Sequence, residues 1–161
     1  MEENAVVSNA PITQLVCFRL ADEEYAVDIT NVQEVIRIQN VTTVPQMPDF
    51  ALGVINIRGN IVPVFDLRTL FQLPRKEFDE LSKILVVSLN GAMFSMIVDQ
   101  ILDNIKIETS HIDPAPDVKM KMERECISGL GHIGDRMIII LDLLKVNGVI
   151  NDEIHKSREK I

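Results

Sequence analysis

The sequence predicts an all-β protein with a few short helices, built from two small barrels that pack side by side. From Thr13 onward, short runs rich in Val and Ile are broken every ~8–12 residues by Gly, Pro, Asn or Asp, which is typical of short strands in closed barrels. Apolar residues make up 47% of the chain and aromatic residues only 4%, so we expect an aliphatic core. The chain also contains two similar halves of about 65 residues, each with about five strands.

Local patterns predict the elements in order. Residues 15–20 and 25–29 read as a β-hairpin, and residues 31–36 read as the start of a short helix with a polar cap. Residues 61–67 form a predicted strand after a tight turn, and residues 67–73 a helical turn.

These elements suggest four segments. Residues 1–12 are a polar lead, 13–80 a first barrel, 81–147 a second barrel and 148–161 a tail that could be helical. Because each half alone would be marginally stable, we expect an apolar seam shared between the two barrels.

The two halves align residue by residue, first at a shift of 69 positions and later at a shift of 76. The step between the shifts falls near residues 117–125, which resemble an inserted loop or short helix. The matched pairs are Leu20 with Leu89, Tyr25 with Phe94, Ile29 with Val98, Val32 with Ile101, Pro45 with Pro114, Gly53 with Gly129 and Asp66 with Asp142.

Composition excludes several classes of function. The formal charge is −8, which disfavours binding to phosphate backbones, and no apolar run reaches the ~18 residues of a membrane-spanning helix. The acidic N-terminus is unlike a secretory signal, and Cys17 and Cys126 read as buried free thiols. We therefore expect a cytoplasmic protein.

No catalytic or metal-binding pattern stands out. Residues 129–134 spell G-x-G-x-x-G, but a β-branched run follows them where a nucleotide-binding fold needs a helix, so a glycine-rich hairpin is expected. The three His residues have no ligand spacing, which leaves no predicted metal or cofactor. Asp66 and Asp142 occupy the same place in each repeat and are predicted to cap backbone N–H groups. We predict that the protein is not an enzyme; an enzyme that uses this Asp pair remains a competing hypothesis.

Residues 53–68 carry a more informative motif. Their sequence, GVINIRGNIVPVFDLR, resembles the G-x-x-N-L-R-G-x-I-x-P-V-x-D-L-R signature of the CheW-like domain family, with Ile57 in place of the usual Leu. Further blocks agree in order at residues 22–25, 32–35, 98–99, 114–116 and 129–137, so that the resemblance extends over residues 14–146.

This resemblance implies two SH3-like five-stranded barrels and an adaptor role in bacterial chemotaxis. The implied partners are the cytoplasmic tip of a chemoreceptor (a methyl-accepting chemotaxis protein) and the regulatory domain of the histidine kinase CheA. Kinase chemistry belongs to the partner, and the adaptor is recruited to membrane-associated receptor arrays. The alternatives are an adaptor of a related pathway that controls pili, surface motility or development, and a barrel that binds a small ligand.

The resemblance also implies two contact surfaces. A groove between the halves is expected to bind the receptor, with Arg58 as the leading residue because a guanidinium can bond carboxylates or helix carbonyls. The full receptor set is Arg58, Asn56, Gly59, Val32, Glu34, Ile36, Val98, Ile101 and Asn104. The expected kinase set is Ile38, Val41, Val44, Asp113 and Val118; at the last two the family often has a basic and an aromatic residue.

Overall fold

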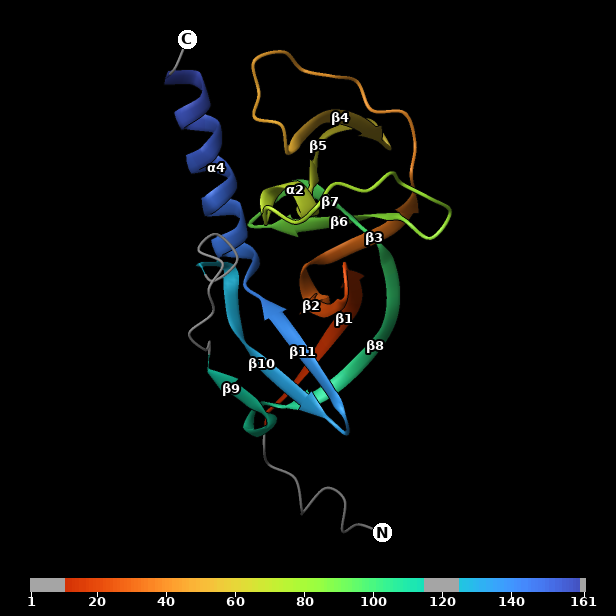
Figure 1. Cartoon of the computed structure of the whole chain (residues 1–161), viewed down its shortest axis with the longest axis vertical. Helices are drawn as coiled ribbons and strands as arrows, with labels where there is room; N and C mark the ends of the chain where they lie inside the picture. Colours follow the sequence, from red (N-terminus) through yellow and green to blue (C-terminus); the bar gives the residue numbers. More distant parts are fainter. Residues whose placement is uncertain (1–10, 115–124, 160–161) are drawn as a thin grey trace.

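The computed structural model describes residues 11–114 and 125–159, and its elements are mostly strands (Figure 1). The strands and helices in chain order are β1 (Ile12–Leu20), β2 (Glu23–Asp28), η1 (Ile29–Asn31), β3 (Val32–Arg37), β4 (Ala51–Ile57), β5 (Asn60–Asp66), α2 (Leu67–Leu70), β6 (Lys83–Leu89), β7 (Ala92–Val98), β8 (Gln100–Glu108), η2 (Thr109–His111), β9 (Ile112–Pro114), β10 (Ile127–Ile133), β11 (Arg136–Leu141) and α4 (Leu143–Glu159).

Two sheets form the molecule and lie one above the other in Figure 1. Sheet A has the strand order β8-β1-β2-β11-β10-β9, and sheet B has the order β3-β6-β7-β5-β4. The all-β class and the two-barrel organisation are confirmed. Most neighbours are antiparallel, and the exceptions in the described residues are the parallel pairs β2–β11 and β5–β7.

The two copies of the repeat exchange strands. Sheet A takes its first hairpin, β1–β2, from the first copy and β8 to β11 from the second, while sheet B takes β6–β7 from the second copy and β3 to β5 from the first. The division of the chain into 13–80 and 81–147 therefore does not separate the sheets. Similarity between halves revealed the duplication, but it carries no information on which copy each strand pairs with.

The duplication itself is visible in matched geometry. Gly53 and Gly129 lie at the same bulge, opposite Val64 and Ile140 respectively, and these two pairs are related by the same shift of 76. A Cβ on Gly129 would lie 2.6 Å from the carbonyl oxygen of Asp113, and a Cβ on Gly53 would collide with the carbonyl of Thr42. Both glycines are therefore needed so that a neighbouring strand can approach.

Residues 31–36 do not begin a helix, and that prediction is wrong. After the short η1 turn, the chain enters β3, where half-buried and exposed side chains alternate. This period of two, with Val32, Val35 and Ile36 in β-branched positions, favours a strand over the expected cap and helix.

Three apolar clusters hold the sheets. Aliphatic residues fill the two barrel interiors, around Val62, Val64 and Ile84 in sheet B and around Leu15 and Ile138 in sheet A. The third cluster lies between the sheets and confirms the expected shared seam. It contains Tyr25 and every Phe except Phe78, which corrects the expectation of a purely aliphatic core. The rings form a chain of contacts, with Phe18–Tyr25 and Tyr25–Phe71 centroids 6.0 Å apart.

The chain after β11 is helical. Helix α4 begins at Leu143, earlier than the expected tail, and packs against the central seam through Val146, Val149 and Ile150. Its first turn is capped by Asp142, whose carboxylate accepts hydrogen bonds from the N–H groups of Leu144 and Lys145. Asp66 caps α2 in the same way, so the predicted structural role of both carboxylates is confirmed. Residues 129–134 form the predicted hairpin, not a nucleotide-binding loop.

We expect Gly53→Ala to lower the free energy of unfolding by more than ~1 kcal/mol, because the φ of +146° is poor for alanine and the new Cβ meets the Thr42 carbonyl. Gly148→Ala is the matched control. Gly148 lies in α4, and beyond its chain neighbours and the backbone of its own helix no described atom lies within 4 Å of the position that a Cβ would take there, so alanine should stabilise the protein by ~0.5–1 kcal/mol. Urea unfolding followed by far-ultraviolet circular dichroism measures the stability of both variants. Equal effects would contradict the conclusion that glycine is required at position 53.

Candidate functional site

The candidate site is centred on the β4–β5 turn. Ile57 pairs with Asn60, so the turn consists of Arg58 and Gly59, with φ values of 53° and 88°. Two positive φ values define a type I′ turn, for which Asn-Gly is the usual sequence. The Asn56 side chain accepts a hydrogen bond of 3.0 Å from the Gly59 N–H and closes the turn. Arg58 is therefore held in an unfavourable backbone conformation at the tip of a rigid hairpin.

The structure brings Arg58 together with Glu34, another predicted receptor residue. Their guanidinium and carboxylate lie 3.4 Å apart, with side chains 80% and 23% exposed. Such an exposed pair contributes little to stability, ~0–1 kcal/mol. It does orient the Arg58 side chain over β3, so that a cation and an anion stand next to each other on one open surface.

The remaining predicted receptor residues divide into two groups. Val32 and Ile36 are half-buried on β3, and Ile101 and Asn104 lie on β8 in the other sheet, with Asn104 exposed. Val32 and Ile101 both pack against the central seam. Val98 is fully buried in that seam, so its side chain does not reach the surface and Val98 is removed from the predicted contact set.

The predicted kinase residues are spread over the molecule. Ile38 and Val41 pack against the core of the sheet B barrel, and Val44 is exposed. Asp113 is exposed and lies 2.8 Å from the Nε2 atom of His132. Val118 lies outside the described residues.

Sequence reasoning missed an ion pair at the junction of the sheets. The Arg68 guanidinium, in α2, donates to Asp99 through Nε at 2.9 Å and Nη2 at 2.8 Å, and the two side chains are 12% and 13% exposed. Asp99 lies at the crossover from β7 in sheet B to β8 in sheet A, and it also accepts the Ala21 N–H of the β1–β2 turn at 2.8 Å. Asp99 thus ties both sheets to α2.

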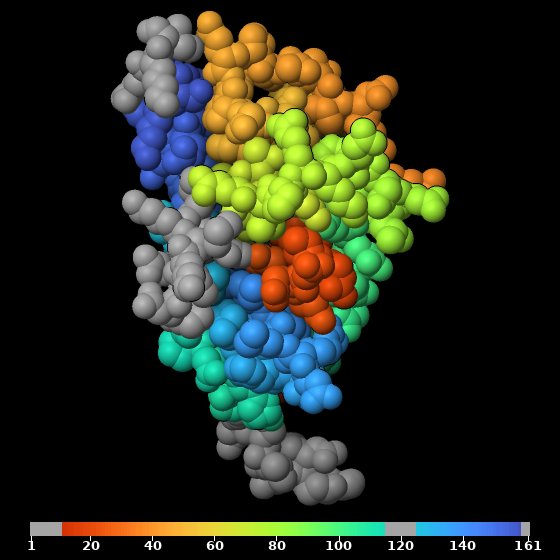
Figure 2. Space-filling view, in the orientation of Figure 1, coloured from red at the N-terminus to blue at the C-terminus, as the bar shows by residue number. Residues whose placement is uncertain are grey.

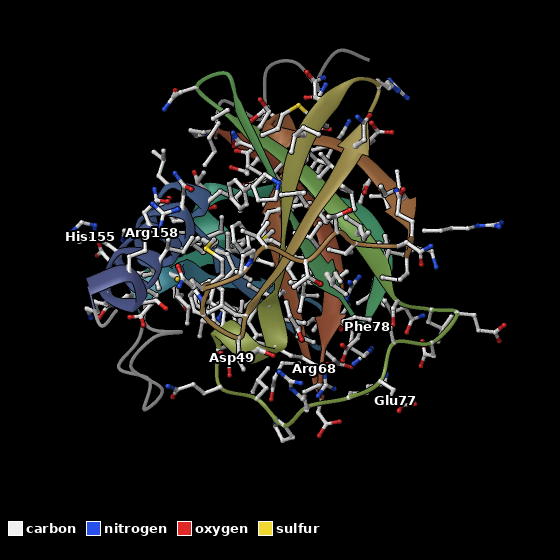
Figure 3. All side chains as sticks on the ribbon, turned by 90° about the horizontal axis from the view of Figure 1, so that it is seen from above. Asp49, Arg68, Glu77, Phe78, His155 and Arg158 are labelled. Atoms are coloured by element: carbon white, nitrogen blue, oxygen red, sulfur yellow. The ribbon has the colours of Figure 1, made fainter. Side chains whose placement is uncertain are left out.

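Figure 3 shows Arg68 on the side of the molecule where Glu77 and Phe78 project, away from the far end of α4 with His155 and Arg158. Figure 2 shows the β1–β2 hairpin wedged between the segment that follows α2 and the β10–β11 hairpin. The Arg68 guanidinium also donates to the carbonyl of Pro74, so it fixes the start of the 74–80 segment. In the sequence, Arg68 is marked only as the last residue of the family motif, Asp-Leu-Arg, and the motif does not indicate that Asp99 is its ion-pair partner.

Burial works against ionisation of Asp99, but the hydrogen bonds from Arg68 and from the Ala21 N–H outweigh it and hold the pKa of Asp99 below its ordinary value. A carboxyl whose pKa is lowered on folding stabilises the folded state above its unfolded pKa of ~3.9, and this contribution is lost as the pH falls through the folded pKa.

A second charged group closes sheet A. The Arg136 guanidinium bonds Glu24 at 2.7 Å and Asp103 at 3.0 Å, and so links β11, β2 and β8. The pKa of Asp103 lies below its ordinary value, chiefly because its carboxylate accepts hydrogen bonds from Arg136. Burial, followed by the charge of Asp103, raises the pKa of the Cys17 thiol to about 12. Cys17 is therefore a poor nucleophile, in keeping with the prediction of a buried free thiol.

Two properties of the described residues bear on the kind of site. Within 11–114 and 125–159, no His, Cys, Asp and Glu side chains cluster in threes or more as a metal ion requires. Over the same ranges, no helix combines the length and apolarity needed to cross a bilayer. The geometry that stands out is a pair of fused β-barrels with a charged turn on an open face.

Comparison with known proteins gives the family. The family model described as the CheW-like domain matches residues 14–149. The chain is 35% identical over 133 residues to the chemotaxis protein CheW of Klebsiella aerogenes, covering 83% of this chain and 80% of the relative. It is 33% identical to CheW of Helicobacter pylori over the same shares. The crystal structure of the scaffolding protein CheW of Thermoanaerobacter tengcongensis superposes with a TM-score of 0.77 at 34% identity, covering 82% of this chain and 90% of that one.

The fold and the site thus define a double-barrel scaffold of the chemotaxis type. The chain belongs to the CheW-like domain family.

We expect Asp99→Asn to lower the free energy of unfolding by ~1.5–3 kcal/mol at pH 7, because Arg68 loses a charged acceptor in a largely buried site. Unfolding by urea at several pH values measures this difference. It should shrink as the pH falls from ~4 through the lowered pKa of Asp99 in the folded protein, because the wild-type carboxyl is then protonated as well. Asp113→Asn, which breaks the exposed pair with His132, is the control and should cost less than ~1 kcal/mol.

We expect Arg58→Asn to raise the free energy of unfolding by ~0.5–1 kcal/mol, because Asn tolerates the positive φ of a type I′ turn far better than Arg. Arg37→Asn, at an exposed position on β3 with ordinary strand backbone, should not stabilise. Denaturation of both variants beside the wild type decides the matter, and destabilisation by Arg58→Asn would show that the Glu34 pair outweighs the strain.

Proposed function

We propose that this protein couples chemoreceptors to the chemotaxis histidine kinase, and that it does so without catalysis of its own. One observation carries the proposal: a strained, rigid turn presents Arg58 on an open surface beside Glu34. The type I′ turn requires a positive φ at this position, but arginine is a poor residue for it, and strained residues cluster at active sites, ligand clamps and switch regions. The similarity to curated chemotaxis proteins supplies the pathway.

In this proposal the receptor's helical tip lies against the surface formed by the β4–β5 turn and β3. Arg58 bonds carboxylates or helix carbonyls of the tip, Glu34 fixes its register by charge, and the half-buried Val32 and Ile36 supply apolar contact. Ile101 and Asn104 on β8 extend the surface on the sheet A side. The whole assembly lies at membrane-associated receptor arrays on the cytoplasmic side.

The kinase's regulatory domain is proposed to bind elsewhere, at Val44 with Ile38 and Val41, and at Asp113. The segment around Val44 supports this assignment because Val44 is exposed while Ile38 and Val41 anchor its base in the sheet B barrel. Because Ile38 and Val41 anchor this segment, it should lose little conformational entropy when Val44 contacts a partner.

An adaptor for a related chemosensory pathway is the second candidate. The chain is 28% identical over 106 residues to the protein FrzA of Myxococcus xanthus, covering 66% of each. The longer and closer matches to chemotaxis proteins named CheW favour the first candidate.

Co-sedimentation tests the proposal. Receptor-containing membranes should bring down the kinase only when this protein is present, and Arg58→Glu should abolish that recovery, a loss of at least tenfold or ~1.4 kcal/mol. Arg37→Glu makes the same charge change three residues from Glu34, so on the opposite side of β3, and should leave recovery unchanged.

The pair of charges allows a sharper control. If Arg58 and Glu34 matter only to each other, the exchanged double variant Glu34→Arg, Arg58→Glu should restore recovery; if they contact the receptor, it should not. Arg58→Asn should also lose recovery although the turn is relieved of strain. Full recovery of the kinase with Arg58→Glu would remove this surface from the receptor site.

A further inference from the structure

A cavity of about 370 Å³ lies where α4 begins, at a distance in sequence from the Arg58 turn. Its floor is apolar and includes Leu15 and Ile140, both buried in the sheet A barrel. Its rim carries the polar groups of Asp28, Asn31 and Asn90, together with Asp142. Two carboxylates line the cavity and no Lys, Arg or His of the described residues does, so its electrostatic preference is for a cation.

The cavity lies beside the position that corresponds, through the internal repeat, to that of the Arg68–Asp99 pair, which itself joins the first copy to the second. The shift of 76 relates Asp66, which caps α2, to Asp142, which caps α4, and relates Arg68 to Leu144. The shift of 69 relates the Ala21 turn to the Asn90 turn, and the two residues share a positive φ, 55° and 51°. At the corresponding position beside the Ala21 turn, the chain's own Arg68 guanidinium bonds Asp99.

In the second repeat that guanidinium is missing. Leu144 stands at the position of Arg68 and is 60% exposed, so it leaves the cavity open. The Asp99 carboxylate is not retained at its own position, where Thr30 is the counterpart. Asp28, two residues earlier, lines the cavity instead, and its Oδ1 accepts hydrogen bonds from the Thr30 N–H at 2.9 Å and from the Thr30 hydroxyl at 2.8 Å. Asp142 likewise uses Oδ1 to cap α4, and among the described residues no donor engages Oδ2 of either carboxylate.

We propose that this cavity, the α4 notch, is a docking site for an arginine side chain of a partner protein in the chemotaxis assembly. The internal repeat supports arginine, because at the corresponding crossover a guanidinium, that of Arg68, bonds a carboxylate. A guanidinium fork can bond two carboxylate oxygens at once, while its three-carbon stem suits the apolar floor. The cavity volume lies at the small end for ligand sites and fits one side chain better than a large cofactor.

Nuclear magnetic resonance of the full chain tests the notch directly, with N-acetyl-arginine methylamide as the probe. We expect millimolar probe to shift the side-chain amide signals of Asn31 and Asn90, which line the rim. The citrulline analogue, which has the same shape without the charge, should bind about tenfold more weakly, the factor of ~1.4 kcal/mol. Equal binding of citrulline, tighter binding of the lysine analogue, or shifts that bypass both amides would overturn the assignment.

Variants of the protein provide an independent test of the α4 notch. Leu144→Arg supplies from within the guanidinium that the first repeat already has, and should abolish the probe shifts and raise the melting temperature. Asn151→Arg adds the same charge about two turns further along α4 and should leave probe binding intact. Asp28→Asn should reduce arginine binding to the level of citrulline. Probe binding that survives Leu144→Arg would place the site elsewhere.

The claim that a protein of the chemotaxis assembly supplies the arginine rests on the proposed function. In the co-sedimentation assay, Leu144→Arg should lower kinase recovery at least fivefold while Asn151→Arg leaves it unchanged. If the probe binds wild-type protein but recovery is unaffected by Leu144→Arg, the notch does not receive an arginine from the receptor or kinase, and the proposal fails in that part. If the wild type recovers no kinase at all, the proposed function fails while the probe result stands.

Discussion

Strand exchange between the two copies of the repeat is the constraint on which the rest of the structure depends. Each copy places its first hairpin in one sheet and its last strands in the other, so neither copy can close a barrel alone. The chain must cross between sheets twice, after β2 and after β7. Those crossovers bring both hairpins against a common seam, and this explains why nearly all of the scarce aromatic rings lie there and not inside a barrel. Aromatic side chains each bury ~150–250 Å² and contribute strongly to cores and interfaces, and this seam is both.

The two crossovers differ in how they are held: an ion pair fixes the second, and no ion pair among the described residues fixes the first. Asp99 at the second crossover receives both the Arg68 guanidinium and the Ala21 N–H, so charge-assisted bonds tie α2 to the two sheets. At the first crossover Asp28 bonds only the local Thr30 among the described residues, and Leu144 faces solvent. Duplication makes these two places equivalent in backbone, and substitution has made them different in chemistry. The same holds for the hairpin tips, where Arg58-Gly59 in one copy corresponds to Gly134-Asp135 in the other. The candidate functional groups therefore lie where the copies have diverged.

The sequence predicted those parts of the fold that local rules determine. Hairpins and the capping roles of Asp66 and Asp142 follow from short-range chemistry, and the structure confirms them. Strand pairing between copies could not be predicted, because it depends on contacts between residues far apart in sequence, such as Val64 with Ser95. For the same reason Val98 was placed on the surface and Asp99 went unnoticed. Arg58 and Glu34 were both predicted, and their contact could not be.

Arg58 shows how stability and binding divide within one turn. A type I′ turn with Asn at this position would be more stable, and the second repeat does place Gly at the corresponding left-handed position. Arginine there costs ~1 kcal/mol or more of backbone strain, and its exposed pair with Glu34 returns at most a comparable amount. Folding alone therefore does not account for the residue. What the strained turn provides is a guanidinium on a short, rigid support closed by Asn56, so that binding requires little further ordering of the backbone. A flexible loop could carry the same charge, but it would lose more entropy each time a partner was bound.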